Sequence, residues 1–393
     1  MTFGCDKQEP MTNMPEEMEE MVEMPTETFM DTIRFASYNV AMYGNNVDEI
    51  LSQLETAEQQ IKLRRLAAVI KKVRPDVLVL MEVDYDAEGK ILDLFRQNLL
   101  SIPLDNFEGI DYPYAYQIQT NTGLISEVDI DGNGTVSLPN DAYGFGNYEG
   151  QYASAILSKY PIDIANQRSF QKFLWKNMPD AALPQNSDGS SYYSEEVLEV
   201  FRLSSKNHID LPLLISDEHT IHALISHPTP PVFDGDEDRN GKRNHDEIKL
   251  WSDYITGENY LVDDNGGTGG LNNDESFMIF GDLNADPVDG DSYNNAISLL
   301  LEHPRVNQNV TTGALIPSSN GGTEHNQSTG NIGDPAYDTS FFGLRIDYVM
   351  PSADLTVVDS GVFWPSSNEE GSELVQNNAA SDHLLVWVDV EFK

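Results

Sequence analysis

The sequence has almost no cysteine and no long apolar run. Cys5 is the only cysteine among 393 residues, which excludes an internal disulfide, so the fold has to rest on its hydrophobic core. No stretch approaches the roughly 20 apolar residues that a membrane-spanning helix needs. Because 39% of the residues are apolar and occur in many short runs, such a core is feasible.

Basic residues are also scarce. The chain has 23 Lys and Arg residues against 65 Asp and Glu residues, which gives a formal charge of −42. Proteins hold nucleic acids largely through Lys and Arg that neutralise phosphates, so this field repels polyanions unless a local basic patch compensates. A processive nuclease is therefore disfavoured, and nucleic acid is not an expected partner. The charge is typical of a soluble secreted protein adapted to salty or calcium-rich surroundings.

Residues 1–30 differ in composition from the rest of the chain. They are rich in Met and Glu from Met11 to Glu27 and almost free of aromatics, which predicts a disordered acidic tether. Cys5, which follows Gly4, has two interpretations: the remnant of a lipoprotein processing site, or an incidental cysteine. A lipid anchor there would be the protein's only contact with a membrane. We expect a monomer that is secreted, periplasmic or held at the cell surface.

The apolar pattern predicts a mixed α/β fold. Apolar runs predict strands at residues 33–40, 77–81, 152–157, 221–226, 277–280, 346–350 and 384–392. Helical spacing predicts helices at residues 63–73, 91–99 and 248–255, and Arg74-Pro75 should end the first of them. This mixed order fits a four-layer α/β sandwich, in which two packed mixed β-sheets are flanked by helices.

Three segments are expected to be loops or insertions, near residues 101–150, 170–207 and 262–275. Loops of this length are uncommon unless they are functional. The second one contains Phe173-Leu-Trp-Lys176, whose aromatic rings would either line a substrate wall or pack the insertion onto the body.

Six polar signatures follow or close short apolar runs, where strands would end. They are Asn39, Glu82, His227, the pair Asp282 and Asn284, Asp347, and Ser381-Asp382-His383. Strand ends and the loops after them carry functional groups on a rigid scaffold, so this placement predicts one site gathered at the edge of a sheet. A site that draws on both ends of the chain implies a single catalytic domain over residues 31–393.

The order of these signatures resembles the endonuclease/exonuclease/phosphatase superfamily, the deoxyribonuclease-I-like metal-dependent phosphoesterases. The most specific pieces are Gly281-Asp-Leu-Asn284, Arg345-Ile-Asp-Tyr348 and Ser381-Asp-His383, and the resemblance runs from about Ile33 to Phe392. It implies the same four-layer architecture. It also implies that Asn39 and Glu82 bind the metal, and that Asp347 holds one ring nitrogen of His383 and favours its protonated form.

Phosphoester hydrolysis needs a metal, a base that activates water, and groups that stabilise the developing charge. A hard cation such as Mg²⁺, or Mn²⁺ or Ca²⁺ in its place, suits Glu82 with Asn39 beside it, and Asp382 would reach the same metal or a second one. His383 would donate to the phosphoryl oxygen. Asp282 would orient or deprotonate the attacking water, and Asn284 would bind a phosphoryl oxygen.

His227 would donate to the phosphate or protonate the leaving oxygen. The segment Pro228-Thr-Pro-Pro231 after it departs from the more open sequence of nuclease members, and it should fix the histidine while shaping a narrow pocket. The other histidines are interpreted as packed or surface residues: His208, His219, His222, His245, His303 and His325.

Two acidic loops resemble calcium sites. Asp236, Asp238, Asn240 and Glu247 have the spacing of an EF-hand loop, although no helix can precede Asp236 so soon after Pro231. They would form a structural Ca²⁺ loop, or else Arg239 and Arg243 would face the active site and bind phosphate. A second, incomplete match contains Asp129, Asp131, Asn133 and Gly134 and ends in Asn140, and it is also an ordinary turn.

The sequence therefore predicts a secreted or surface-tethered metal-dependent phosphoesterase, specifically a phosphatase that acts on small phosphoesters. An extracellular endonuclease or phosphodiesterase is the second hydrolase interpretation. A catalytically inactive binding module on the same fold is the third, and the complete set of acids, amide and histidines argues against it.

Overall fold

The structure is a computed structural model that describes residues 1–2, 31–325 and 330–392. Cys5 and nearly all of the predicted tether lie outside the described residues, so their predictions stay predictions.

The described chain forms two mixed β-sheets. A six-stranded sheet has the order β10-β11-β1-β2-β4-β3, and a five-stranded sheet has the order β5-β6-β7-β8-β9. Only β1 with β2 and β7 with β8 run parallel, and every other neighbouring pair is antiparallel. The strands of the first sheet are β1 (Asp31–Met42), β2 (Val77–Val83), β3 (Tyr114–Ile118), β4 (Ala153–Ser158), β10 (Thr356–Val362) and β11 (Val386–Phe392). Those of the second are β5 (Arg168–Ser169), β6 (His208–Leu214), β7 (Thr220–Ser226), β8 (Ser276–Asp282) and β9 (Asp347–Pro351).

The two sheets pack face to face around one core. The ring of Phe35 in β1 lies 6.3 Å from that of Phe280 in β8, with apolar residues of both sheets around them. Residues 77–81 of β2 are all fully buried, because this strand is covered by the other sheet on one face and by helices on the other. Such double burial explains why the run is continuously apolar rather than alternating.

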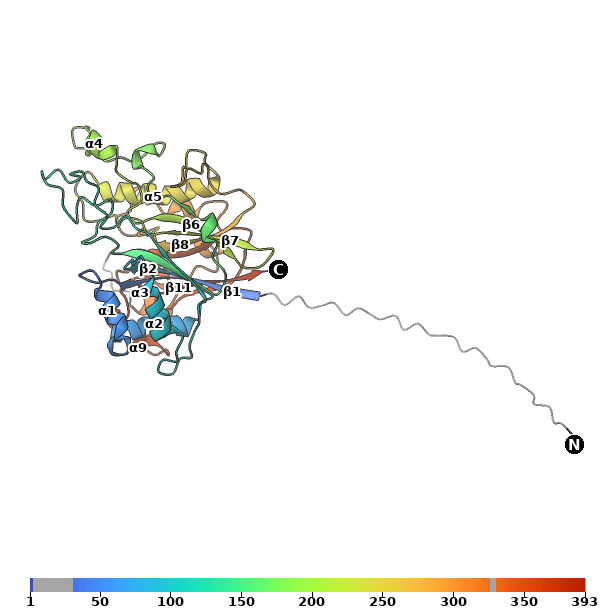
Figure 1. Cartoon of the computed structure of the whole chain (residues 1–393). Helices are drawn as coiled ribbons and strands as arrows, with labels where there is room; N and C mark the ends of the chain where they lie inside the picture. Colours follow the sequence, from blue (N-terminus) through green and yellow to red (C-terminus); the bar gives the residue numbers. More distant parts are fainter. Residues whose placement is uncertain (3–30, 326–329, 393) are drawn as a thin grey trace.

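Helices cover the outer faces of both sheets and complete the predicted four-layer sandwich (Figure 1). On the six-stranded side lie α1 (Glu49–Glu55), α2 (Ile61–Val73), α3 (Lys90–Phe95) and α9 (Ser372–Val375), and on the five-stranded side lie α4 (Glu195–Leu198) and α5 (Arg239–Thr256). The amphipathic helix α2 buries Leu66 and Ile70 and ends at Val73, directly before Arg74-Pro75 as predicted. Arg74 is the residue that caps the helix, and its backbone is left-handed.

Short helices make up the connections. They are η1 (Ala57–Gln59), the π-helical turn η2 (Arg96–Leu100), η3 (Ile164–Asn166), η4 (Trp175–Asn177), η5 (Tyr293–Asn295), α6 (Ser298–Leu301), α7 (Gln308–Thr311), α8 (Asn320–His325), η6 (Pro335–Tyr337) and η7 (Gln376–Asn378).

Four strands of the structure were not predicted from the sequence. The segment near 101–150, expected to be an insertion, contains the edge strand β3, whose partly exposed face weakens its apolar pattern. β6 was not predicted because it contains Pro212, and proline has no N–H to donate to the hydrogen bonds of a β-sheet. This proline is tolerated because β5 pairs only with Ile209 and Asp210, and beyond them, among the described residues, that side of β6 has only the isolated bridge of Ile162 with Leu213. The remaining two are β5, with two residues, and β10, with polar residues in its centre.

The aromatic residues of the second insertion form part of a second core under α5. Trp175 is fully buried, its Nε1 donates to Asp246 Oδ2 at 2.6 Å, and its ring lies 6.2 Å from that of Phe201. Phe173 is also buried, in the same cluster. These residues therefore pack the insertion onto the body and do not form a substrate wall.

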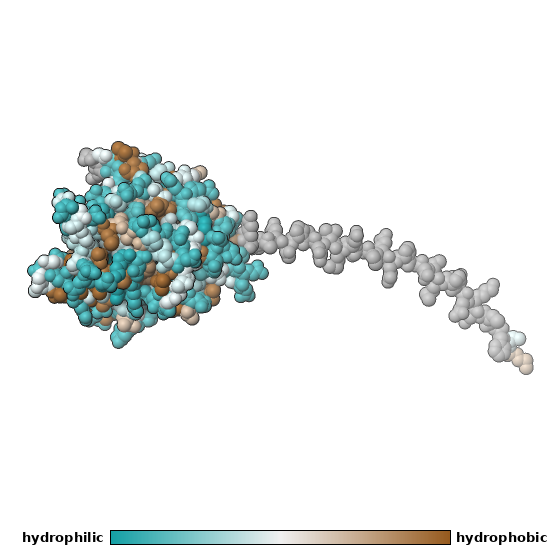
Figure 2. All heavy atoms as spheres, turned by 90° about the horizontal axis from the view of Figure 1, so that it is seen from above, coloured by the Kyte–Doolittle hydropathy of each residue, from teal (hydrophilic) through white to brown (hydrophobic). Residues whose placement is uncertain are grey.

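The surface is mostly polar (Figure 2), in agreement with the large number of acidic residues. The face in Figure 2 is mostly hydrophilic, with hydrophobic residues in small separate patches. Within the part of the chain that the structure describes, no helix combines the length and the apolar character that crossing a bilayer requires.

Candidate active site

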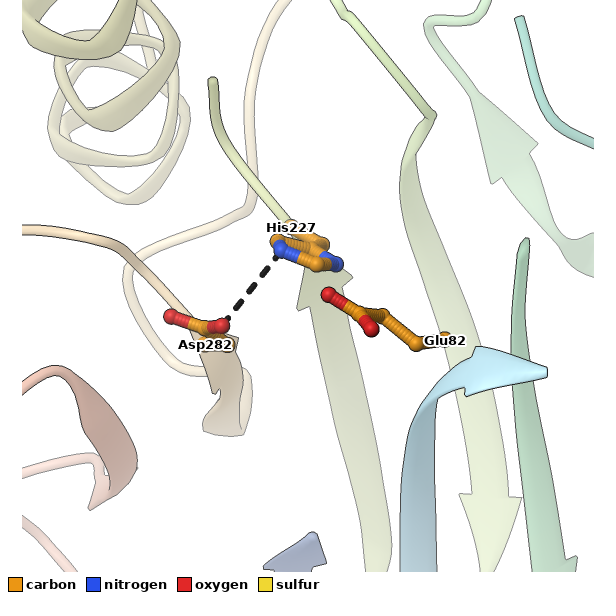
Figure 3. A group of neighbouring side chains, drawn as sticks. All are labelled: Glu82, His227 and Asp282. Atoms are coloured by element: carbon orange, nitrogen blue, oxygen red, sulfur yellow. Dashed lines mark ion pairs between the residues drawn. The ribbon is translucent and has the colours of Figure 1, made fainter. Parts of the chain in front are cut away.

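The residues predicted to form a site lie together at one end of the two sheets. Glu82 closes β2, His227 follows β7 and Asp282 closes β8, and the three side chains point toward one another (Figure 3). His383 lies beside them, with its Nε2 3.6 Å from Asp282 Oδ2. Residues far apart in the sequence thus meet because the parallel pairs β1 with β2 and β7 with β8 end at the same edge.

A β-bulge turns Glu82 out of the regular strand. Its φ is +58°, in the left-handed region that non-glycine residues rarely adopt, and the β2–β4 register shifts between Met81 and Val83. The pairing of β1 with β2 is displaced at the same level, between Asn39 and Met42. Backbone strain of this kind persists where the surrounding structure imposes it, often at functional sites.

A close approach of two strands sets Asp282 beside His227. A Cβ atom on Gly281 would lie 2.0 Å from the carbonyl oxygen of Ser226, so only glycine fits between β8 and β7 at this point. The next residues on each strand, Asp282 and His227, come within 3.4 Å of each other through Oδ2 and Nε2. The glycine of the Gly281-Asp-Leu-Asn284 motif therefore has a packing reason.

Asp282 is the centre of the cluster. Its Oδ2 accepts a hydrogen bond from Asn39 Nδ2 at 3.0 Å and faces both histidines, while its Oδ1 accepts from the Asn284 main-chain N–H at 3.1 Å. Burial raises the pKa of Asp282 to about 6, although the positive charge of His383 opposes the shift. The carboxylate is thus set up to hold or accept a proton near neutral pH.

The two histidines differ in charge. Burial alone would lower the pKa of His383, but Asp347 and Asp282 outweigh it and raise this pKa to about 10, so the ring is an imidazolium at neutral pH. Burial, together with the charges of Lys206 and His383, lowers the pKa of His227 well below its usual value, so that ring is neutral. His227 Nδ1 is buried and has no hydrogen-bond partner among the described residues.

The donor set fits a hard divalent cation. Glu82, His227 and Asp282 each offer an atom, and these atoms lie within 4.8 Å of one another. Burial raises the pKa of Glu82, because carboxylates crowded in a poorly solvated site are costly to ionise, and a cation would relieve this cost. Carboxylate oxygens suit Mg²⁺, Mn²⁺ or Ca²⁺, and Glu82 remains partly exposed, so an ion can reach it.

The two other predicted ligands lie close by. Asn39 donates to Asp282, and its Oδ1 accepts from the Ala41 N–H at 3.1 Å. Asp382 adds its negative charge to the surroundings of both Lys62 and His383. Asn284 is held by the loop after His227, since its Nδ2 donates to the Pro228 carbonyl at 3.1 Å.

Two lysines at the site were not predicted from the sequence. Lys206 is buried, with 8% of its surface exposed, and its charge acts on both Glu82 and Asp282. Its Nζ lies 3.5 Å from the Pro228 carbonyl oxygen. Lys62 Nζ donates to the Ala41 carbonyl at 2.5 Å, next to the Glu82 bulge. Both lysines belong to segments without a polar motif, so only the folded chain identifies them.

The predicted EF-hand loop is wrong, because the chain is helical from Arg239 onward. This carries Glu247 along α5 into the interior, away from Asp236, Asp238 and Asn240. Glu247 Oε1 accepts from the Ser205 N–H at 2.6 Å and from Ser205 Oγ at 2.9 Å, and Oε2 accepts from the Thr229 N–H at 2.6 Å. Glu247 therefore anchors the segments that carry Lys206 and His227.

The alternative role for Arg239 and Arg243 in phosphate binding is also wrong. Arg243 is buried and donates to the carbonyl oxygens of Leu203, Tyr143 and Arg202. Arg239 forms an ion pair with Glu237. Both guanidinium groups hold the insertion or the start of α5.

The second acidic match is a turn with one unexpected member. Asp141, rather than Asn140, joins Asp129 and Asp131 in a group of carboxylates whose oxygens lie within 4.8 Å of one another. Asp141 is fully buried and accepts from the N–H groups of Ile130 and Ser137, both at 2.7 Å.

Solved structures resemble the fold at low sequence identity. An endonuclease/exonuclease/phosphatase from Beutenbergia cavernae has a TM-score of 0.48 and 16% identity over 92% of this chain and 72% of its own. A mannosyl-6-phosphatase from Bacteroides thetaiotaomicron has a TM-score of 0.44 and 13% identity over 92% and 100% of the two chains. A β toxin from Staphylococcus aureus has a TM-score of 0.43 and 14% identity over 91% of this chain and 99% of its own. A comparison with curated proteins gives no match.

The sequence profile of the Endonuclease/Exonuclease/phosphatase family matches residues 36–383, a range that contains the whole cluster from Asn39 to His383. Together with the two packed sheets and the site at their common edge, this match shows that the chain belongs to the endonuclease/exonuclease/phosphatase family.

Proposed function

We propose that this protein is a metal-dependent phosphatase that hydrolyses small phosphoesters by the attack of water. Members of the family hydrolyse phosphoesters, generally with a divalent metal. The observation that carries the proposal is the placement of the buried Asp282 between a charged His383 and a neutral His227, at 3.6 and 3.4 Å. Asp282, which can accept a proton, and His383, a cationic hydrogen-bond donor, thus lie side by side in the site.

Each residue has a role that follows from its surroundings. Asp282 orients the attacking water and accepts its proton at Oδ2, which is favoured by the raised pKa. His383 donates from Nε2 to a phosphoryl oxygen as negative charge develops, and Asp347 holds the ring from the opposite side at 2.8 Å. His227, being neutral, donates a hydrogen bond to the phosphate and does not supply a proton to the leaving oxygen.

Other residues balance the charge of the phosphate. Lys206 is the buried cation of the site, and Asn284 offers its amide to a phosphoryl oxygen. Glu82, with Asn39, Asp282 and Asp382 close by, would hold the cation. When bound, the cation would polarise the phosphoryl oxygens and lower the pKa of water.

The small number of basic side chains at the site favours a small substrate. Four basic residues near the site in sequence are engaged within the fold: Arg239 with Glu237, Lys242 with the Glu237 carbonyl, Arg243 with three carbonyls, and Arg345 with the carbonyls of Val310 and Thr311. Lys206 and Lys62 also donate to carbonyl oxygens, those of Pro228 and Ala41, but their charges act on Glu82 of the site. Two lysines suit one or two phosphates and do not form a track for a polynucleotide.

We also propose that the enzyme is secreted, periplasmic or tethered to the cell surface, and that it acts as a monomer. The charge of −42 and the single cysteine near an acidic N-terminal segment support this. A lipid on Cys5 would be the membrane contact. Mass spectrometry of the protein from its native host tests the anchor, and an unmodified N-terminus would exclude it.

The activity is tested with Glu82→Ala and Asp282→Ala, assayed on p-nitrophenyl phosphate with chelation and add-back of Mg²⁺, Mn²⁺ and Ca²⁺. Loss of a charge-stabilising group costs about 10²- to 10³-fold in kcat, so both variants should be nearly inactive. Glu58→Ala, at an exposed position of η1, is the matched control. Near-native turnover by either site variant at saturating metal would contradict the assignment.

A further inference from the structure

Two adjoining polar pockets lie beside the candidate active site. Their volumes are about 200 and 250 Å³, and Gln119, Gln171 and Lys172 line both of them, so they form one continuous depression. We call it the amide groove, because these two glutamines and Asn265 supply much of its polar wall. The residues of the amide groove take no part in the mechanism above.

The topology places the amide groove at the edge that carries the site. Gln119 follows β3, and Ile118 pairs with Ser154 of β4, which also pairs with Met81 next to Glu82. Gln119 therefore lies two strands across from Glu82, a distance of roughly 10 Å at the usual strand spacing.

Strand pairing in the five-stranded sheet also places the amide groove beside the site. Gln171 follows β5, whose Ser169 pairs with Ile209 of β6, and the neighbouring His208 pairs with Ser226, just before His227. Tyr85, three residues after Glu82, lines the pocket nearer the site. The amide groove thus extends from the side of the site to the edge strands β3 and β5.

The groove contains a buried polar group without a partner. Gln167 lines the outer pocket, and its side-chain oxygen Oε1 is buried and has no hydrogen-bond partner among the described residues. An amide in this position costs about 1–3 kcal/mol unless something satisfies it. The side-chain amides of Gln119 and Asn265, on the same wall, have no partner there either.

The chemistry of this wall favours a hydroxylated ligand. A primary amide both donates and accepts, and so does a hydroxyl group, whereas an anion needs donors and a cation needs acceptors. The only carboxylate of the outer pocket, on Asp264, already accepts from Ser169 Oγ at 2.7 Å and the Lys172 N–H at 2.9 Å. The charged side chains of the inner pocket have both signs, Glu149 against Lys172 and Arg202, and Arg202 already donates to Asn121 Oδ1 at 2.6 Å. Tyr116 and Tyr85 add aromatic surface for the C–H groups of such a ligand.

We propose that the amide groove binds a sugar and holds the carbohydrate part of a phosphorylated sugar substrate. This rests on the proposed phosphatase function and specifies its substrate class. Each pocket is smaller than the roughly 300 Å³ at which sites for drug-sized ligands begin, which suits one sugar unit in each.

Selectivity between substrates tests the proposal. The holoenzyme is assayed on the 6-phosphates of glucose, mannose, galactose and N-acetylglucosamine, and on p-nitrophenyl phosphate as a reference without a sugar. We expect at least one hexose phosphate to exceed the reference in kcat/KM. Gln119→Ala and Gln171→Leu should each lower that ratio about tenfold, the effect of losing one hydrogen bond to the ligand. Gln97→Ala, an exposed amide in η2, is the matched control and should keep the ratio.

Direct binding separates this inference from the proposed function. Calorimetric titration of the four hexose 6-phosphates into the Glu82→Ala variant measures the groove without turnover. Binding that is weakened by adding Gln119→Ala supports the proposal, and Gln119 is exposed, so its replacement should not disturb folding. An unchanged ratio in both groove variants, or no binding of any hexose phosphate, would overturn the amide groove even if p-nitrophenyl phosphate is hydrolysed.

Discussion

Asp347 Oδ2 lies 2.8 Å from His383 Nδ1, and the same oxygen accepts a hydrogen bond from Thr339 Oγ1 at 2.9 Å. Both the carboxylate and the ring are buried. This arrangement fixes the plane of the imidazole and directs its other nitrogen, Nε2, toward Asp282. The charge of His383 therefore depends on Asp347, and its position depends on the hydrogen bond between them.

The first prediction follows from this dependence. His383→Ala and Asp347→Ala should each lower kcat/KM by a similar factor, and the double variant should lose little more, because residues that act as a unit are not additive. Steady-state kinetics on p-nitrophenyl phosphate measure the three variants, with thermal melts to confirm that each is folded. Losses that add fully in the double variant would show that the pair does not act as a unit.

The second prediction concerns Lys206. Burial lowers the pKa of Lys206, and the carboxylates of Glu247, Glu82 and Asp282 oppose the shift. Lys206→Met should lower kcat/KM on a phosphomonoester about 10²-fold, since it removes a fixed positive charge from a poorly solvated site. Lys206→Arg should recover part of the loss. Lys242→Met, which removes a cation bonded to the Glu237 carbonyl, is the control. Equal activity of Lys206→Met and wild type would remove Lys206 from the mechanism.

Much of the sheet framework could be predicted, because central strands carry a strong local signal. Residues 77–81 are apolar on both faces, and Glu82 ends the run, so both the strand and the unusual carboxylate were visible in the sequence. Edge strands carry less signal. β3 is half exposed, and Pro212 lies within β6, so the local pattern argued against strands that long-range pairing stabilises.

The residues of the site also fall into those that the sequence predicts and those that only the folded chain brings together. The family pattern identified Asp282, His227 and His383, and the structure places Asp282 Oδ2 3.4 Å from His227 Nε2 and 3.6 Å from His383 Nε2. Lys206 could not be found in this way, because long-range contacts bring its segment to the site, among them the hydrogen bonds of Glu247 to Ser205 and Thr229. The spacing that made Glu247 resemble a calcium ligand was coincidental, since a helical backbone turns that side chain inward.

The third prediction concerns stability and pH. Burial, followed by the charges of Asp286, Asp289 and Asp334, raises the pKa of Asp338 from 3.8 to about 7. The folded protein thus binds this proton more tightly than the unfolded chain, so stability falls as pH rises from about 4 to about 7. Asp338→Asn should raise Tm at pH 8 and leave it nearly unchanged at pH 4.

Thermal melts across this range measure the effect. Asp111→Asn, at an exposed carboxylate, is the control and should not change the pH dependence. If Asp338→Asn fails to stabilise the protein at pH 8, its carboxylate is not a source of strain in the folded state.

The last prediction concerns the charge and size of the substrate. A protein with a charge of −42 repels duplex DNA, and the described structure commits Arg239, Arg243 and Arg345 to partners within the fold. At physiological salt, p-nitrophenyl phosphate or a nucleotide monoester should therefore be cleaved with a higher kcat/KM than duplex DNA. Any activity on a polyanion should rise as salt screens the repulsion, the reverse of the behaviour of proteins that bind nucleic acid through released counterions. Initial rates on both substrates between low and high salt measure this. Efficient degradation of plasmid DNA at low salt, with weak turnover of monoesters, would instead identify the protein as a nuclease.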